Sequence, residues 1–128
     1  MKIGVLGAGQ LGRMLALSAY PLGHQMRFLA SSEEDPSSLL GKTYIYDNPE
    51  TINKFFEDSD VITYESENTD VEILNKIGKT TKVYPGRESL QYTQHRGREK
   101  ALLDKLNIPC APYKIISSLS DLKRAISS

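Results

Sequence analysis

Three glycines near the start of the chain form a loop that could bind an anion. Gly7, Gly9 and Gly12 stand in the pattern G-x-G-x-x-G, directly after a short apolar run and directly before a helical pattern. In that context the first glycine permits a tight turn, the second lets a ligand approach the backbone, and the third allows close helix–strand packing. The unpaired amides at the helix start would then face an anion, typically a phosphate. The alternative is a turn that merely needs glycine.

A dinucleotide cofactor is the standard inference from such a loop, and the end of the second apolar run argues against it. A nicotinamide-binding domain requires an acidic residue there, to hold the ribose hydroxyls. Here the run ends at Ala30 and continues into Ser31 and Ser32, and Glu33 comes late, in a polar loop. Arg27 and the serines could suit a ribose 2′-phosphate. An NAD(P)-binding domain of an oxidoreductase therefore stays open as an alternative.

Two carboxylates follow a later β-rich run, where parallel sheets bind their ligands. Glu65 and Glu67 come directly after residues 61–64, and open α/β sheets bind ligands outside the carboxyl ends of their strands. Strand alternation points both carboxylates to the same side. They could accept hydrogen bonds from ribose hydroxyls or from an amine. By itself, such a pair is more often just a polar loop.

A basic pair in the last third of the chain is a candidate for a phosphate contact. Arg96 and Lys100 are four residues apart and share one face of a predicted helix, whereas Arg98 points elsewhere. A guanidinium suits a phosphate because its planar fork can donate two hydrogen bonds. Composition alone favours a solvated helix face for these residues.

The other reactive residue types form no site that the sequence reveals. His24 follows a Pro-Leu-Gly turn and is expected to be structural, and His95 is expected to be an exposed helix residue rather than a general base. Neither has metal-ligand spacing with another candidate, so no metal site is predicted. Cys110 has no neighbouring base, so we expect a packing residue rather than a nucleophile. No catalytic residue is assigned.

Composition restricts the partners and the location of the chain. Sixteen basic residues balance sixteen acidic ones, so nothing attracts nucleic acid or an anionic membrane in general. No apolar run approaches the roughly 20 residues that span a bilayer, and the apolar start is too short for a signal peptide. With one cysteine an internal disulfide is impossible, and a reducing cytoplasm is the simplest location.

Alternating strands and helices are expected to position these residues. β-rich runs predict strands at residues 2–6, 25–30, 43–46, 61–64 and 82–84. Helices are predicted at 11–20, from Asn48-Pro49 through Phe56, and at 71–77, the first with helical spacing of its apolar residues Leu11, Met14, Leu15, Leu17 and Ala19. Short links between these elements predict an α/β fold, with a parallel sheet covered by helices on both faces.

The pattern changes after Pro85-Gly86. Helices are predicted at residues 88–92 and 93–106, the longer one with apolar contacts from Leu102, Leu103 and Leu106. A strand at 112–117 and a helix at 121–126 then begin a unit that the chain does not close. With 128 residues the chain has room for one domain and a short part of a second. We expect a first domain over 1–92, and a linking helix and the start of another domain over 93–128.

Three motifs, in order, resemble those of the 5-(carboxyamino)imidazole ribonucleotide synthetases, ATP-grasp enzymes of purine biosynthesis. Residues 9–16 (GQLGRMLA), with PLGH at 21–24, are similar to the family's opening signature. Residues 60–68 (DVITYESEN) resemble its strand ending in Thr-Tyr-Glu-Phe-Glu-Asn. Residues 94–100 and 106–112 (LNIPCAP) resemble its Gln-Asp-Arg, Glu-Lys and Gly-Ile-Pro-x-Ala-Pro stretch. Together the motifs cover nearly the whole chain.

The resemblance implies a Rossmann-like pre-ATP-grasp domain that binds substrate without binding a dinucleotide, followed by the start of a truncated ATP-grasp domain. It implies a ligase in which ATP phosphorylates bicarbonate to carboxyphosphate, and the amine of 5-aminoimidazole ribonucleotide captures the carboxyl group. ATP and Mg²⁺ would be bound mainly beyond Ser128, so the isolated chain is expected to be inactive. A homodimer is implied for the full-length enzyme.

The resemblance also implies roles for particular residues. Those expected to approach 5-aminoimidazole ribonucleotide belong to the glycine turn and the acidic tip after residue 64: Gly9, Gln10, Leu11, Gly12, Glu65 and Glu67. Gln10 would donate or accept hydrogen bonds, and the turn amides would contact the phosphoribosyl part. Arg96 matches the family's ATP-contacting arginine, and Lys100 is the second candidate for that contact.

Two departures from the family pattern and three alternatives remain. Ser66 stands where the family has phenylalanine, which would loosen packing behind the acidic tip. His95 and Gly97 replace an acidic residue and a leucine beside Arg96, which would weaken or re-aim the nucleotide contact. The alternatives are an NAD(P)-binding domain, a folded but non-catalytic remnant, and a related enzyme such as the glycinamide ribonucleotide transformylase, whose loop has glutamate at the position of Gln10.

Overall fold

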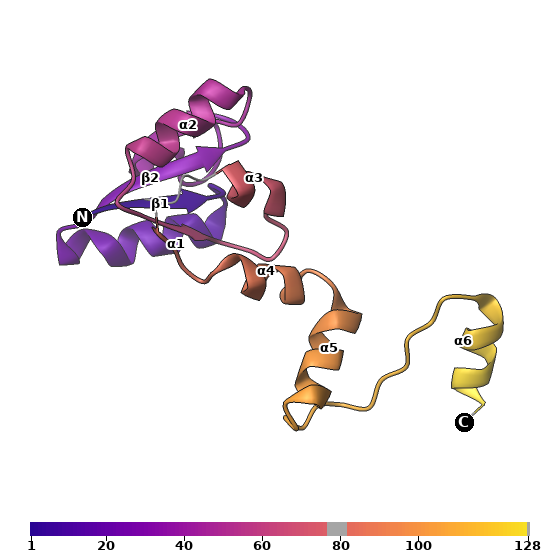
Figure 1. Cartoon of the computed structure of the whole chain (residues 1–128). Helices are drawn as coiled ribbons and strands as arrows, with labels where there is room; N and C mark the ends of the chain where they lie inside the picture. The colour runs from indigo at the N-terminus through magenta and orange to yellow at the C-terminus, as the bar shows by residue number, and fades with distance from the viewer. Residues whose placement is uncertain (77–81, 128) are drawn as a thin grey trace. The chain divides into compact units, whose positions relative to one another are not determined.

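The computed structural model describes residues 1–76 and 82–127 of the chain. These residues form two compact units, Met1–Gln91 and Tyr92–Ser128. Figure 1 shows the sheet and its covering helices in the first unit, and helices joined by irregular segments in the second.

The first unit is built on a parallel sheet of five strands in the order β3-β2-β1-β4-β5. The strands are β1 (Lys2–Leu6), β2 (Gln25–Ala30), β3 (Lys42–Ile45), β4 (Val61–Tyr64) and β5 (Lys82–Val83). The predicted parallel sheet is confirmed, and β1, β2 and β4 begin and end at the predicted residues. The chain builds the sheet in one direction from β1 to β3 and then in the other, so the strand order reverses between β1 and β4.

Helices cover both faces of this sheet, as predicted. They are α1 (Gln10–Ala19), α2 (Pro49–Glu57) and α3 (Val71–Lys76), with short 3₁₀ turns η1 (Tyr20–Leu22) and η2 (Ser38–Leu40). Figure 1 shows α1 and α2 on opposite sides of β1 and β2. Side chains alternate along a strand, so Leu6 joins the core under α2 and α3 whereas Val5 joins the core under α1. The expected end of α3, Ile77, lies outside the described residues.

The large apolar residues of α1 are not the ones that it buries. Its buried residues are Gly12, Ala16 and Ala19, whereas Leu11, Met14, Leu15 and Leu17 are 41–63% exposed. The spacing of apolar residues predicted the helix correctly but pointed to the wrong face. Small residues at positions i, i+4 and i+7 let the helix backbone lie close to the sheet, which leaves no room beneath it for leucine side chains.

A charge cluster lies at the edge of the sheet where the strands begin. The carboxylate of Asp58, which follows α2, accepts hydrogen bonds from Lys2 Nζ at 2.9 Å, Arg27 Nε at 3.0 Å, Lys42 Nζ at 3.1 Å and Tyr44 OH at 2.7 Å. Hydrogen bonds from Lys2 and Tyr44, reinforced by Lys42 and the charge of Arg27, hold the pKa of Asp58 far below its ordinary value. One carboxylate thus links the starts of three strands to the end of α2.

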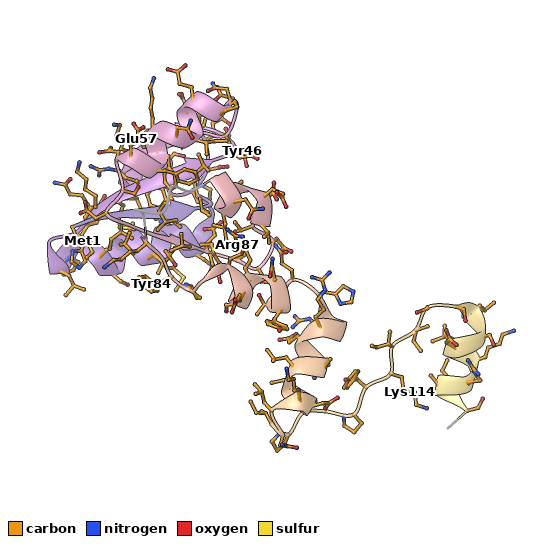
Figure 2. All side chains as sticks on the ribbon, in the orientation of Figure 1. Met1, Tyr46, Glu57, Tyr84, Arg87 and Lys114 are labelled. Atoms are coloured by element: carbon orange, nitrogen blue, oxygen red, sulfur yellow. The ribbon has the colours of Figure 1, made fainter. Side chains whose placement is uncertain are left out.

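The second unit contains helices and an irregular segment. Helix α4 (Arg87–Thr93) runs across the boundary between the units, and α5 (Arg96–Lys105) and α6 (Leu119–Ile126) follow. The predicted strand at 112–117 is wrong: these residues, among them Lys114 in Figure 2, have no regular structure. A strand needs a neighbour for its backbone hydrogen bonds, and the described part of this unit contains no second strand. Leu106, an expected contact, is 55% exposed.

Candidate functional site

A pocket of about 230 Å³ opens at the carboxyl ends of the strands. Its lining includes Leu6 and Gly7 around the end of β1, residues 29–31 around the end of β2, Tyr46 after β3, and much of the loop after β4. This is the place where the strand order reverses, between β1 and β4, and such a switch point is where open α/β sheets bind ligands.

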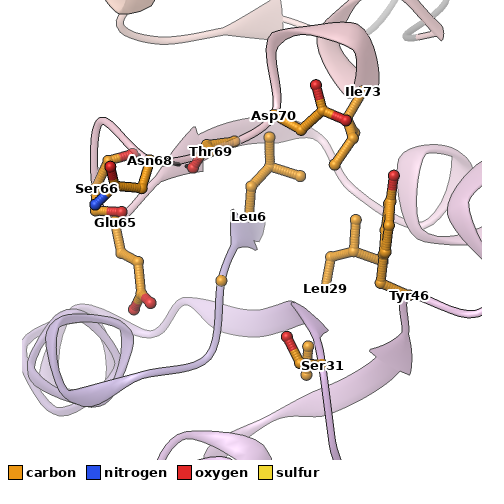
Figure 3. A pocket seen from close by; sticks show the side chains of 12 residues that line it. Leu6, Leu29, Ser31, Tyr46, Glu65, Ser66, Asn68, Thr69, Asp70 and Ile73 are labelled. Atoms are coloured by element: carbon orange, nitrogen blue, oxygen red, sulfur yellow. Dashed lines mark hydrogen bonds between the residues drawn. The ribbon is translucent and has the colours of Figure 1, made fainter. Parts of the chain in front are cut away.

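The pocket combines an apolar floor with a polar rim. Figure 3 shows Leu6 at its centre, between the loop that carries Glu65 and Ser66 and the side chains of Leu29 and Tyr46. Polar groups of the rim come from Ser31, Tyr46, Asn68, Thr69 and Asp70. A flat apolar ring could lie on such a floor, and hydroxyl groups could reach the rim, which is the usual division of work in small-molecule sites.

The carboxylate of Glu65 lies in the glycine turn. The amide of Gly9 donates to both carboxylate oxygens at 3.1 Å, and the amide of Gly12 donates to Oε2 at 2.7 Å. The backbone supports this arrangement, because the amide of Glu65 also donates to Leu6 O at 3.3 Å. The glycine turn and the acidic tip, which the resemblance assigns to one substrate, are therefore in direct contact.

Each glycine of the motif leaves room for this carboxylate. A Cβ atom added to Gly7, Gly9 or Gly12 would lie 2.7, 2.8 or 2.9 Å from an atom of the Glu65 carboxyl group. Gly7 also has a φ angle of +108°, which other residues rarely adopt. The sequence interpretation gave the same space to a ligand, whereas in the structure a side chain of the protein fills it.

Ser37 holds the turn from its other side. Its side chain is fully buried, and its Oγ donates to Gly9 O at 2.8 Å while its amide donates to Ala8 O at 2.9 Å. Ser37 belongs to the polar stretch that follows β2, and no role was predicted for it. No local signal distinguishes it from the neighbouring serines, because its partners are about 28 residues away in the chain.

The predicted substrate residues divide into two groups. Glu65 lines the pocket, and Gly9 and Gly12 contact its carboxylate. Gln10 and Leu11, the first two residues of α1, are exposed and lie outside the residues that line the pocket.

Glu67 is also exposed and also lies outside the lining. The alternation argument that paired it with Glu65 was wrong, because β4 ends at Tyr64. Beyond that residue the chain turns, with the amide of Thr69 donating to Ser66 O at 3.4 Å.

Sequence reasoning missed several residues of the rim. Ser31, Tyr46 and Asp70 line the pocket; Tyr46 and Asp70 had no assigned role, and Ser31 was considered only for a ribose 2′-phosphate. A signal for them existed, because Ser31 and Tyr46 directly follow the carboxyl ends of β2 and β3. The rule that parallel sheets bind ligands at these ends was applied to β4 alone.

The predicted nucleotide contacts both belong to α5. Arg96 is its first residue, and its guanidinium lies 2.6 Å from Glu99 Oε2 with the Arg96 side chain 80% exposed. Lys100, one turn further on, has its Nζ atom 5.9 Å from the centre of the Tyr113 ring, a cation–π distance. Both groups lie on the surface of the second unit.

His95 is the N-cap of α5 rather than a residue within a helix. Its Nδ1 atom accepts hydrogen bonds from the amides of Gly97 at 3.1 Å and Arg98 at 3.3 Å, so α5 begins later than predicted. A Cβ atom on Gly97 would lie 3.0 Å from His95 Cε1. The two substitutions beside Arg96 are therefore coupled: the imidazole of His95 takes the capping position of an acidic residue, and Gly97 makes room for the ring.

Metal-binding clusters and membrane-spanning helices are absent from residues 1–76 and 82–127. Within these ranges no three His, Cys, Asp or Glu side chains gather closely enough to hold a metal ion. Within the same ranges, every helix is too short or too polar to cross a membrane. Cys110 is a free, partly exposed thiol.

Solved structures share this architecture. The N5-carboxyaminoimidazole ribonucleotide synthetase of Thermus thermophilus superposes with a TM-score of 0.86 at 35% identity, over 98% of this chain and 35% of that one. The Aspergillus clavatus N5-carboxyaminoimidazole synthase, in complex with ADP and 5-aminoimidazole ribonucleotide, gives a TM-score of 0.81 at 29% identity, over 96% of this chain and 34% of that one.

Sequence comparisons point to the same relatives. The N5-carboxyaminoimidazole ribonucleotide synthase of Bacillus subtilis is 35% identical over 97% of this chain and 33% of its own length. The chain spans 13% of a bifunctional purine synthesis protein of Dictyostelium discoideum and 36% of the N5-carboxyaminoimidazole ribonucleotide synthase of Pseudomonas aeruginosa. The model of the ribonucleotide synthetase preATP-grasp domain matches residues 1–94. With its parallel sheet and its pocket at the switch point, the chain belongs to the ribonucleotide synthetase preATP-grasp domain family.

Proposed function

We propose that the chain is the substrate-binding part of an ATP-dependent ligase of purine biosynthesis. The ligase carboxylates 5-aminoimidazole ribonucleotide with bicarbonate, through carboxyphosphate. The names of the relatives support this activity, and the Aspergillus clavatus complex supports the substrate. Because the chain spans about a third of the Bacillus subtilis relative, the activity is proposed for a polypeptide of the relatives' length, and the chain alone is expected to be inactive.

The pocket at the switch point is the observation that carries this proposal. Its apolar floor suits an aminoimidazole ring, and its rim of hydroxyl, amide and carboxyl groups suits a ribose. Glu65, in the wall, would accept a hydrogen bond from the amine or a ribose hydroxyl of the substrate. Gln10, Leu11 and Glu67 would contact parts of the substrate that extend beyond the pocket, whereas Gly9 and Gly12 would act by holding Glu65.

The second unit would contribute to nucleotide binding. Arg96 and Lys100 on α5 are proposed to contact the phosphates of ATP, whose presence in this reaction is supported by the ADP complex from Aspergillus clavatus. Mg²⁺ would neutralise those phosphates, mainly with ligands outside this chain. Residues 93–128 are proposed as a linking helix and the start of an ATP-grasp domain. A homodimer and a cytoplasmic location are proposed for the full-length enzyme.

Titration of the ¹⁵N-labelled chain with 5-aminoimidazole ribonucleotide tests the substrate site. We expect saturable shifts of the amides of Ser31, Tyr46 and Asp70. The change Tyr46→Ala removes a partly exposed wall of the pocket, so it should weaken binding about tenfold. The change Glu57→Ala, on an exposed position of α2, should leave binding unaltered. Saturable shifts confined to residues outside the pocket would refute the proposal.

A further inference from the structure

We infer that Glu65 is a built-in anion that takes the place of a bound phosphate in the glycine turn. In this role Glu65 is a positioning residue: it fixes the turn and the start of α1, and it excludes phosphate from the amides of Gly9 and Gly12. This inference does not depend on which substrate the pocket binds.

The donors of the turn are those that hold a phosphate in dinucleotide-binding domains. In such domains the amides of the glycine loop and of the first helical turn point at the ligand phosphate. Here Gly9, the N-cap of α1, and Gly12, in its first turn, direct their amides at Glu65 instead. The shortest of these contacts, 2.7 Å from Gly12 N to Oε2, is typical of a charge-assisted hydrogen bond.

The helix itself lacks a local anion. Gly9 has no side chain with which to cap α1, and the first turn of α1 contains no acidic residue. The positive end of a helix dipole is stabilised by a nearby negative charge, and Glu65 supplies one from 53 residues further along the chain. The carboxylate therefore replaces both the missing cap and the missing ligand.

Space and charge both keep a phosphate out while Glu65 is in place. The carboxyl group lies so close to the turn that a single methyl group on Gly7, Gly9 or Gly12 would collide with it. A phosphate oxygen that accepted from the same amides would need to lie about 2.9 Å from them, against the carboxylate oxygens. Two anions at that separation repel strongly in a partly buried site.

The fold holds this carboxylate firmly. The amide of Glu65 donates to Leu6 O at the end of β1, and buried Ser37 fixes Gly9 from the opposite side by donating to its carbonyl at 2.8 Å. The turn is thus clamped between β4 and the loop after β2. A ligand phosphate would have to displace an anchored side chain, and we expect the turn to reject it.

Inorganic phosphate and NADPH are the probes that test the inference, with the amide signals of Gly9 and Gly12 in the ¹⁵N-labelled chain as the readout. The wild-type chain should show no saturable shift of these signals at millimolar concentrations of either probe. The change Glu65→Ala should create a phosphate site there, with affinity at least about tenfold above the wild type. The control Glu57→Ala, which removes an exposed carboxylate on α2, should behave as the wild type.

Two outcomes would overturn the inference: saturable phosphate binding at Gly9 and Gly12 in the wild type, or a folded Glu65→Ala chain that gains none. The change Glu65→Gln provides a second test if Glu65→Ala does not fold, because it keeps the size of the side chain and removes its charge. It should bind phosphate at the amides of Gly9 and Gly12 more tightly than the wild type does. A folded Glu65→Gln chain that gains no such binding would also contradict the inference. A failure to bind 5-aminoimidazole ribonucleotide would leave every one of these results unchanged.

Discussion

Removal of the Asp58 carboxylate should destabilise the chain through two poorly exposed donors. The side chain of Arg27 is 11% exposed and Tyr44 is 7% exposed, so Asp58→Ala leaves the Nε group of Arg27 and the phenol of Tyr44 without the acceptor that they share. A hydrogen bond to a charged group contributes about 1.5 kcal/mol or more. Two such bonds give an expected loss of about 3 kcal/mol in the free energy of unfolding.

The other partners of Asp58 add little to this figure. Lys2 and Lys42 are 45% and 60% exposed, and ion pairs in water contribute little because solvent screens them. The change Tyr44→Phe removes one donor and keeps the charge, so it should cost about 1 kcal/mol. We therefore expect the free energy of unfolding to be lowest for Asp58→Ala, higher for Tyr44→Phe and highest for the wild type.

Urea denaturation followed by far-ultraviolet circular dichroism measures these differences in the full chain. The matched control is Glu57→Ala, which removes the exposed carboxylate next to Asp58 and should change stability by less than about 0.5 kcal/mol. A loss for Asp58→Ala below about 1 kcal/mol relative to this control would refute the reasoning, because the poorly exposed donors would then have found other acceptors.

The same carboxylate predicts how stability depends on pH. The pKa of Asp58 is lowered in the folded chain from its ordinary value of 3.8. A depressed pKa contributes stability that is present above the ordinary value and is lost as the pH falls toward the folded value. The wild type should therefore lose stability below about pH 4 more steeply than Asp58→Asn. Parallel curves for the two proteins below that pH would contradict the assignment.

Two further predictions concern glycines that leave room for a side chain. Gly12→Ala would place a Cβ atom 2.9 Å from Oε2 of Glu65 and should lower the free energy of unfolding by about 1–3 kcal/mol. The control is Gly86→Ala, because a Cβ atom at that position meets no atom within 4 Å. Thermal denaturation compares the two variants, and an equal loss of stability in both would rule out a collision between the Cβ atom at position 12 and Glu65. His95→Ala should fray the start of α5, at a cost of about 1 kcal/mol, visible in ¹³Cα shifts. Gly97→Leu should also fray the start of α5, but only while His95 is present. Additive effects of His95→Ala and Gly97→Leu in the double variant would show that the two positions are independent.

Most of the sheet was predictable because its signals are local. β1, β2 and β4 are short apolar runs bounded by turn residues, and a buried parallel strand needs no information from its partners to be recognised. The helix after Asn48-Pro49 was equally clear: the Asn48 side chain accepts from Thr51 N at 2.9 Å, as an N-cap should. The segment at 112–117 failed because strand propensity cannot supply the neighbour that a strand requires.

The candidate site was only partly predictable. Gly7, Gly9 and Gly12 marked the turn, but glycine makes the same room for a phosphate as for a carboxylate of the protein. The two interpretations differ in a contact between residues 53 positions apart, which no spacing rule reveals. The packing face of α1 was hidden for a similar reason: periodicity identifies a helix, and the sheet beneath it selects small residues such as Ala16.

The hydrogen bonds at Glu65 leave the carboxylate with spare capacity. An ionised carboxyl group offers about four lone-pair positions, and three of its contacts are with the turn, from Gly9 to both oxygens and from Gly12 to Oε2. Oε1 can therefore receive an additional donor from the pocket while the helix keeps its cap. A ligand that supplies an N–H or O–H group would add a hydrogen bond to Oε1 without breaking those from the turn. Ligand binding is therefore compatible with an intact cap on α1.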